Sequence, residues 1–268
     1  MSKIILFSVL LIFSFSVFAQ QTVNQTDPQG RKQGFWQKRD AAGKLIYEGT
    51  FKDDHPAGEM KRYHPNGTVK AVLLFSENSD TVSARLFDQK GKLVAKGFYL
   101  GQKKTGEWSN YTEERLVSTE NYLEDRKNGI AKRYYPSGEL LDETTWVNDV
   151  QEGIYKAYDK AGNKYIECIY KNGKRNGPFV SFYPNEVIEM EASYVDNLRN
   201  GDWKYYNEDG KLNYKLKYDK GVLMTPDVLD SIQKINFYDL ENNKNKVIDP
   251  EQFIADPAQY ILKDRMNK

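Results

Sequence analysis

The chain has 268 residues, of which 39% are hydrophobic, 29% are charged and 13% are aromatic. Its 39 basic and 38 acidic residues leave a formal charge of +1. This balance excludes the basic excess that a nucleic-acid footprint needs. Because aromatic residues are abundant and aliphatic ones are few, a thin core of stacked rings is expected.

Residues 1–19 have the pattern of a secretory signal peptide. A basic start at Lys3 precedes a short apolar run, and small residues precede a cleavage site after Ala19. The apolar run is shorter than the roughly 20 residues that a membrane-spanning helix needs, so no transmembrane segment is expected after cleavage. The mature chain is therefore predicted to be exported, to a periplasm, to an outer membrane or to the outside of the cell. Residues 20–33 form a lead-in.

A glycine recurs about every 24 residues over 34–222, with one step skipped at Val82. These phase glycines are Gly34, Gly58, Gly106, Gly129, Gly153, Gly177 and Gly201. A fixed period in this range indicates a repeat architecture, in which each unit stacks on its neighbours.

Each repeat predicts one β-hairpin. Two places after the phase glycine stands a bulky or apolar residue, the largest being Trp36, Trp108 and Trp203, and seventeen places after it stands an aromatic residue. Apolar residues alternate before that last aromatic, which is typical of a strand with one buried face, and turn segments such as 63–67 (Tyr-His-Pro-Asn-Gly) precede them. The predicted fold is all-β: an elongated antiparallel β-meander solenoid of about eight hairpins and about sixteen strands, with a short C-terminal helical cap.

The repeat pattern carries a family resemblance. Segment 201–212, which reads Gly-Asp-Trp-Lys-Tyr-Tyr-Asn-Glu-Asp-Gly-Lys-Leu, resembles the bacterial variant of the MORN repeat, and the resemblance covers roughly 30–222. Proteins built from this variant are often labelled YwqK-family antitoxins. The resemblance implies a scaffold, a protein-binding surface or a contact with membrane lipid.

No constellation typical of an enzyme is found. His55 lies beside Asp53 and Asp54, but a zinc site needs three or four convergent ligands. Cys168 has the inward parity of a strand and is predicted to be a small buried hydrophobe. We therefore expect no enzymatic activity, no catalytic residue, no metal and no cofactor.

Aromatic residues are the candidates for binding. Those on the first strand of each repeat are expected to form the core. In each pair of neighbouring rings, one ring should point away from the packed side, and Tyr135, Tyr183 and Tyr205 are the predicted contact residues.

The last segment, 223–268, breaks the period. Residues 227–240 predict a helix that begins near Pro226 and covers the end of the sheet over Leu216 and Tyr218. The following stretch resembles a degenerate EF-hand, in which Glu241, Asn243, Asn245 and Asp249 are weak calcium candidates. Lys246 replaces the glycine of the sharp turn and Gln252 replaces the bidentate glutamate, so calcium binding at useful affinity is not expected.

The leading hypothesis is a non-enzymatic exported scaffold that binds another envelope protein through the face or the edge of its sheet. Two alternatives stay open: an antitoxin-like partner of a toxin, and a module that binds glycan or cell wall through exposed aromatic rings. Contact with lipid also stays open.

Overall fold

The computed structural model describes residues 22–243. They belong to two compact units, one ending at Arg115 and the other beginning at Leu116. The sequence predicted a single repeat region over 34–222 and no such division. The division lies beside the two-residue turn at Glu113 and Glu114, in the repeat that is one residue short and lacks the second glycine.

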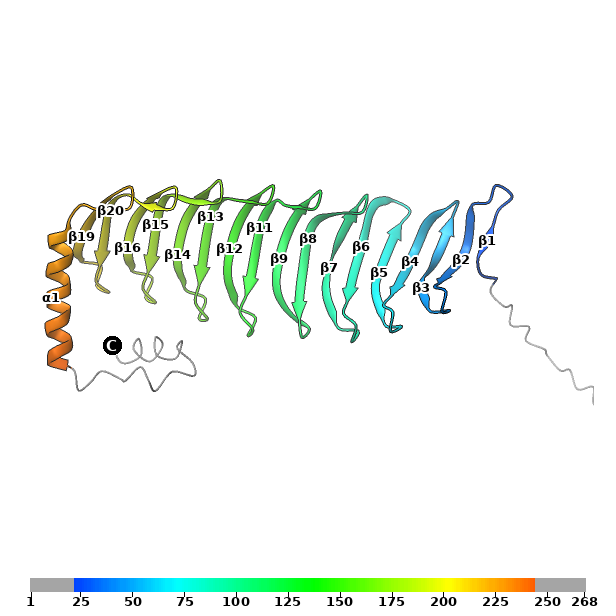
Figure 1. Ribbon diagram of the computed structural model, residues 1–268, viewed down its shortest axis with the longest axis horizontal. Coiled ribbons are helices and arrows are strands. Elements are labelled where there is room, and N and C mark those ends of the chain that lie inside the picture. The colour runs from blue at the N-terminus through cyan, green and yellow to red at the C-terminus, as the bar shows by residue number, and fades with distance from the viewer. Residues whose placement is uncertain (1–21, 244–268) are drawn as a thin grey trace, which may run out of the picture. The chain divides into compact units, whose positions relative to one another are not determined.

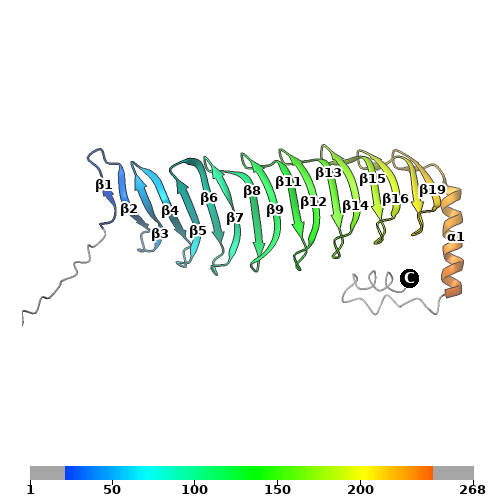
Figure 2. The same cartoon turned by 180° about the vertical axis from the view of Figure 1, so that it is seen from behind.

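The first unit is an antiparallel sheet in which each strand pairs with the next strand along the chain. Figures 1 and 2 show these strands side by side in chain order. The strands are β1 (Gln25–Thr26), β2 (Lys32–Arg39), β3 (Leu45–Lys52), β4 (His55–Tyr63), β5 (Val69–Ser76), β6 (Ser79–Phe87), β7 (Leu93–Leu100) and β8 (Lys103–Thr112).

The second unit continues the same hairpin pattern and ends in a helix (Figure 1). The strands are β9 (Arg115–Leu123), β10 (Arg126–Lys127), β11 (Gly129–Tyr134), β12 (Leu140–Val147), β13 (Val150–Tyr158), β14 (Lys164–Lys171), β15 (Lys174–Phe182), β16 (Ile188–Val195), β17 (Leu198–Arg199), β18 (Gly201–Tyr206), β19 (Leu212–Asp219) and β20 (Val222–Leu223). The helix is α1 (Pro226–Asn243).

The predicted meander of stacked hairpins with a C-terminal helix is confirmed. Over residues 22–243 there are twenty strands instead of about sixteen. Two predicted strands are each split in two, as β10 with β11 and as β17 with β18, and the short strands β1 and β20 were not predicted.

The phase glycines belong to strands. In β13, Gly153 has a φ of 97°. The register with β12 shifts at this point, from the pair Thr144–Tyr155 to the pair Trp146–Gln151. The glycine therefore forms a β-bulge, whose left-handed backbone a residue with a Cβ atom adopts only with strain.

Two kinds of turn join most of the neighbouring strands. Turns of the first kind contain the second glycine of the repeat, such as Gly67 with a φ of 89°. The second kind has two residues that both have positive φ, such as Asp53 at 51° and Asp54 at 67°. This is the type I′ pattern, which matches the twist of a two-stranded ribbon.

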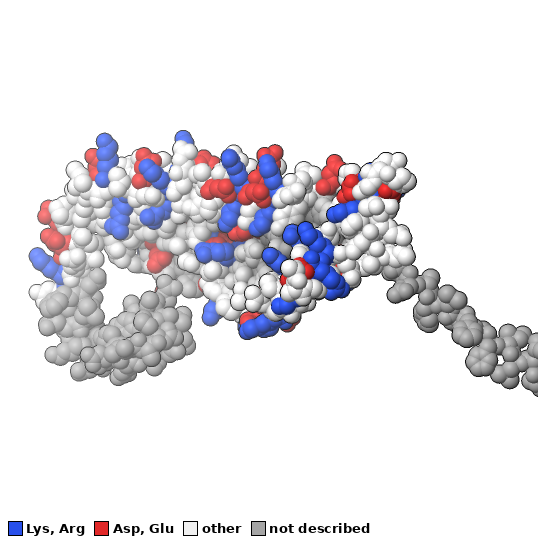
Figure 3. Space-filling model, turned by 45° about the vertical axis from the view of Figure 1, so that its right-hand side comes forward, with Lys and Arg blue, Asp and Glu red and all other residues white. Residues whose placement is uncertain are grey.

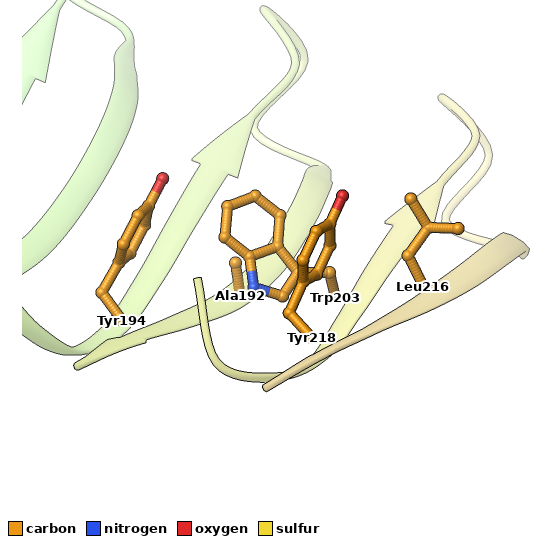
Figure 4. Close-up of a cluster of buried hydrophobic side chains, with 5 residues drawn as sticks. All are labelled: Ala192, Tyr194, Trp203, Leu216 and Tyr218. Carbon is orange, nitrogen blue, oxygen red and sulfur yellow. The ribbon is translucent and has the colours of Figure 1, made fainter. Parts of the chain in front are cut away.

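Helix α1 begins at Pro226, as predicted. Leu229 on this helix packs against a buried cluster at the end of the sheet, which consists of Ala192, Tyr194, Trp203, Leu216 and Tyr218 (Figure 4). Just before the helix, the Thr225 hydroxyl oxygen accepts a hydrogen bond from the Lys217 backbone N–H at 3.0 Å.

Basic and acidic side chains are mixed over the surface seen in Figure 3. Over the described residues, ion pairs such as Lys204–Glu191 (3.1 Å) and Lys156–Glu143 (3.4 Å) join neighbouring strands. Such mixed charge is typical of a solvated sheet face.

Candidate binding surface

One face of each sheet carries a ladder of aromatic rings. In the second unit, ring centres are separated by 5.7 Å for Phe179–Tyr194, 5.2 Å for Tyr194–Trp203 and 5.4 Å for Trp203–Tyr218. Figure 4 shows Tyr194, Trp203 and Tyr218 on the same side of the ribbon. Offset and edge-on contacts of this kind each stabilise the sheet beyond the area that they bury. We call this side the ring-bearing face.

Cations cover many of these rings. The guanidinium carbon of Arg175 lies 4.2 Å from the ring centre of Tyr194, and that of Arg199 lies 4.8 Å from the ring centre of Trp203. In the first unit, Lys104 Nζ lies 4.6 Å from the ring centre of Trp108. Each cation is attracted to the negative face of its ring. These cations shield the rings that they cover from solvent.

The ladder is interrupted in two repeats. The place two residues after the phase glycine holds a ring in five repeats and a methionine in one, but an alanine at Ala84 and at Ala131. The five rings are Trp36, Trp108, Tyr155, Phe179 and Trp203. A hollow of the surface lies at each alanine repeat.

The first hollow is an apolar groove in the first unit, over β5, β6 and β7, with a volume of about 750 Å³. Leu73, Leu86 and Tyr99 are among the residues that line it. Arg62 and Lys70 also contribute to the lining, which contains no carboxylate. We call this hollow the β5–β7 groove.

The second hollow is a polar cavity of about 320 Å³ in the second unit, lined by residues that include Ala131, Arg133 and Asp142. Asp142 is only 2% exposed, and its two carboxylate oxygens share the single Nε proton of Arg133, at 3.0 and 3.1 Å, and accept a further hydrogen bond from Nη2. The bond to Asp142 raises the pKa of Arg133. Burial and the nearby charge of Asp142 raise the pKa of Tyr155 to about 12. The repeat therefore holds a charged pair where the next repeat holds the apolar pair Ala157 and Ile166.

One of the three predicted contact residues, Tyr205, does not point away from the packed side. Tyr205 lies on the ring-bearing face, stacked on Tyr214 with ring centres 4.5 Å apart, and burial raises its pKa to about 12. The prediction that it points away from the packed side is wrong. Counting by twos from Trp203 keeps Tyr205 on the same face, and Tyr206, as the next residue of the strand, points to the other face.

Tyr135 and Tyr183 are half-buried and connect one repeat to the next. The Tyr135 hydroxyl donates to the Tyr158 carbonyl at 2.9 Å, and the Tyr183 hydroxyl donates to the Tyr206 carbonyl at 2.8 Å. Histidine has the same role in the first unit, where His64 Nε2 lies 2.9 Å from the Phe87 carbonyl oxygen. These side chains tie neighbouring turns together, and a binding role for the two tyrosines stays a prediction.

Several first-strand tyrosines that we expected in the core lie on the opposite face. Tyr63, Tyr158 and Tyr206 donate their hydroxyl protons to Glu48, Glu143 and Glu191, at 2.5, 3.1 and 2.8 Å. These glutamates belong to the solvated face, between residues that point into the ring-bearing face.

Cys168 is buried, as predicted, and burial raises the pKa of its thiol to about 11. Within residues 22–243, no three His, Cys, Asp or Glu side chains are grouped so as to hold a metal ion. Of the calcium candidates, Glu241 and Asn243 belong to the end of α1, while Asn245 and Asp249 lie outside the described residues. The described part of the chain also contains no helix that is both long and apolar enough to span a membrane.

The fold and its ladder define the class, a protein of repeated β-hairpins. Five segments match the family model described as the MORN repeat variant, at residues 57–77, 127–148, 151–172, 175–196 and 199–220. The predicted resemblance is confirmed for these segments, which all lie within 34–222. No curated protein matches the chain.

Proposed function

We propose that this protein is a non-enzymatic exported scaffold that binds another protein of the cell envelope through the ring-bearing face of its sheets. The observation that carries the proposal is the interruption of the ring ladder at Ala84 and Ala131, where the face is hollowed. MORN repeats suggest a repeat scaffold. The regular side chains of this chain build turns and stacked rings, and such surfaces suit recognition of a partner.

Export is supported by the signal-like segment 1–19. Cell fractionation and N-terminal sequencing of the purified protein test it, and the expected first residue is Gln20. Leu10→Arg, which breaks the apolar run, should leave an uncleaved precursor in the cytoplasm. An uncleaved wild-type protein in the cytoplasm would contradict export.

Partner binding is tested by affinity purification from a mild detergent extract of the native host, followed by mass spectrometry. We expect one envelope protein in amounts comparable with the bait, and recovery of this protein when the partner carries the tag. An adjacent small toxic reading frame, together with loss of viability when this gene alone is deleted, would favour the antitoxin alternative instead. Retention on insoluble peptidoglycan without any protein partner would favour glycan binding.

A further inference from the structure

The β5–β7 groove lies where the repeat omits a ring. Ala84 in β6 pairs with Leu73 on one side and with Gly97 on the other, and it is only 1% exposed. In β8 the same repeat position holds Trp108, whose indole covers Gly97 and is 0% exposed. The first unit therefore has a ring at Trp108 and a hollow beside Ala84.

The volume and the lining of the β5–β7 groove suit one large apolar side chain together with the backbone that carries it. A volume of about 750 Å³ is within the range of ligand sites in proteins, roughly 300–1,000 Å³. Leu73, Phe75, Leu86 and Tyr99 supply the apolar lining. A partner's aromatic ring in this hollow would continue the stacking that the ladder shows elsewhere.

The rim of the β5–β7 groove carries positive charge. Arg62 and Lys70 are exposed residues of the lining, and within the described residues neither forms an ion pair. The ion pair of Lys61 with Glu59, at 3.2 Å, lies on the opposite face of the same strand. Without a carboxylate among the lining residues, the rim attracts negative charge on a partner.

We propose that the β5–β7 groove binds an aromatic side chain of a partner protein, presented on a short segment with acidic residues on both sides of the ring. The inference rests on the proposed function and names the surface and the chemistry of the partner. The ring lies against Leu73, Leu86 and Tyr99, and the carboxylates lie near Arg62 and Lys70.

Binding is tested with synthetic peptides and the full-length mature protein, by isothermal titration calorimetry. The probe is acetyl-Asp-Glu-Trp-Asp-Glu-amide. Replacing its tryptophan by alanine should weaken binding about 30-fold, as expected for the loss of a buried aromatic anchor. Replacing its four acidic residues by lysine should abolish binding, and added salt should weaken binding of the acidic probe.

Protein variants place the probe in the groove. Ala84→Trp puts the missing ring in place and should abolish binding. Arg62→Gln should weaken binding about threefold, as expected for one exposed charge, and Lys61→Gln on the opposite face should leave binding unchanged. If Ala84→Trp does not fold, the inference is tested by comparing Arg62→Gln with Lys61→Gln and by measuring the tryptophan-to-alanine peptide.

Three outcomes would overturn the inference. They are no binding of the acidic tryptophan peptide at millimolar concentration, equal binding of the lysine peptide, and equal effects of Arg62→Gln and Lys61→Gln. Binding to phosphatidylglycerol vesicles that Arg62→Gln weakens, without peptide binding, would show that the groove contacts lipid. If Ala84→Trp still recovers the envelope partner from extracts, the groove is not the contact surface although the scaffold function stands.

Discussion

At the residue scale, small side chains on the ring-bearing face decide where a ring can stand. Trp108 lies against Gly97, and its Nε1 donates to the Phe98 carbonyl at 3.0 Å. A Cβ atom on Gly97 would be 2.4 Å from Trp108 Cδ2, much closer than van der Waals contact. Glycine at this place is therefore explained by the ring that covers it.

Gly97→Ala should destabilise the protein by about 1–3 kcal/mol, because the indole has to move from a packed position. The matched control is Gly49→Ala at the same place of an earlier repeat, where the nearest atom is the Met60 Cβ at 3.0 Å. The contacts there are longer, 3.0–3.2 Å against 2.4–2.6 Å at Gly97, so we expect the smaller loss there. Urea unfolding followed by circular dichroism compares the two variants. A larger loss for Gly49→Ala would contradict this account.

Cys168 makes stability depend on alkaline pH. Burial raises the pKa of its thiol from about 9 in the unfolded chain to about 11 in the folded protein. The folded state then keeps the proton while the unfolded state loses it, so this contribution to stability is present below pH 9 and is lost as the pH rises towards 11. Thermal unfolding at a series of pH values should show a steeper fall for the wild type than for Cys168→Ala. Parallel curves would show that the thiol does not contribute.

At the element scale, neighbouring hairpins are tied together at both kinds of turn. Tyr183 joins a first turn to the next repeat through the Tyr206 carbonyl. At the second kind of turn, the Lys127 backbone N–H donates to Asp149 Oδ1 at 2.7 Å, and the Asp149 N–H donates to the Lys127 carbonyl at 3.0 Å. These bonds join turns about one repeat apart in the sequence and hold the stack in register.

Tyr183→Phe removes one tie and keeps the ring. We expect a loss of about 0.5–1.5 kcal/mol, the usual net contribution of one hydrogen bond. Hydrogen exchange should become faster at the turn between β15 and β16 and at the Tyr206 turn, but not in β12 or β13. Unchanged exchange at both turns would mean that the hydroxyl bond is not formed in solution.

Helix α1 protects the last hairpin through Leu229. Leu229→Ala should cost about 1–3 kcal/mol and speed exchange in β18 and β19, because the cluster around Leu216 and Tyr218 loses its cover. Ile235 on the same helix is 61% exposed, so Ile235→Ala should change neither quantity noticeably. Equal effects of the two substitutions would contradict the capping role.

Much of this arrangement could be predicted from the repeat period alone. The 24-residue spacing and the alternation of apolar residues predict the hairpins, and the inward parity predicts the burial of Cys168. Prediction failed at the faces of the rings, because the residues two and five places after the phase glycine were both assigned to the core, although an odd separation puts them on opposite faces of a strand. Tyr205 was therefore placed on the wrong face, and Tyr63 and Tyr206 were assigned to the core. The alanines at 84 and 131 were visible in the sequence, but the hollows beside them depend on how the neighbouring rings pack.

At the scale of the whole molecule, the repeats leave few places where a partner can reach the rings. Acidic and basic side chains cover the solvated face, and cations lie over many rings of the ladder. The β5–β7 groove and the cavity at Ala131 are two hollows of the ring-bearing face within the described residues. We propose that the protein recognises its partner at these interruptions of a regular surface.

Site-specific photo-cross-linking in living cells tests this claim most directly. A benzophenone amino acid replaces Arg62 at the rim of the β5–β7 groove, or Leu74, which is 53% exposed on the opposite face of the neighbouring strand. Our account predicts one cross-linked envelope protein from position 62 and none from position 74. Cross-links from position 74 alone, or the same products from both positions, would contradict it.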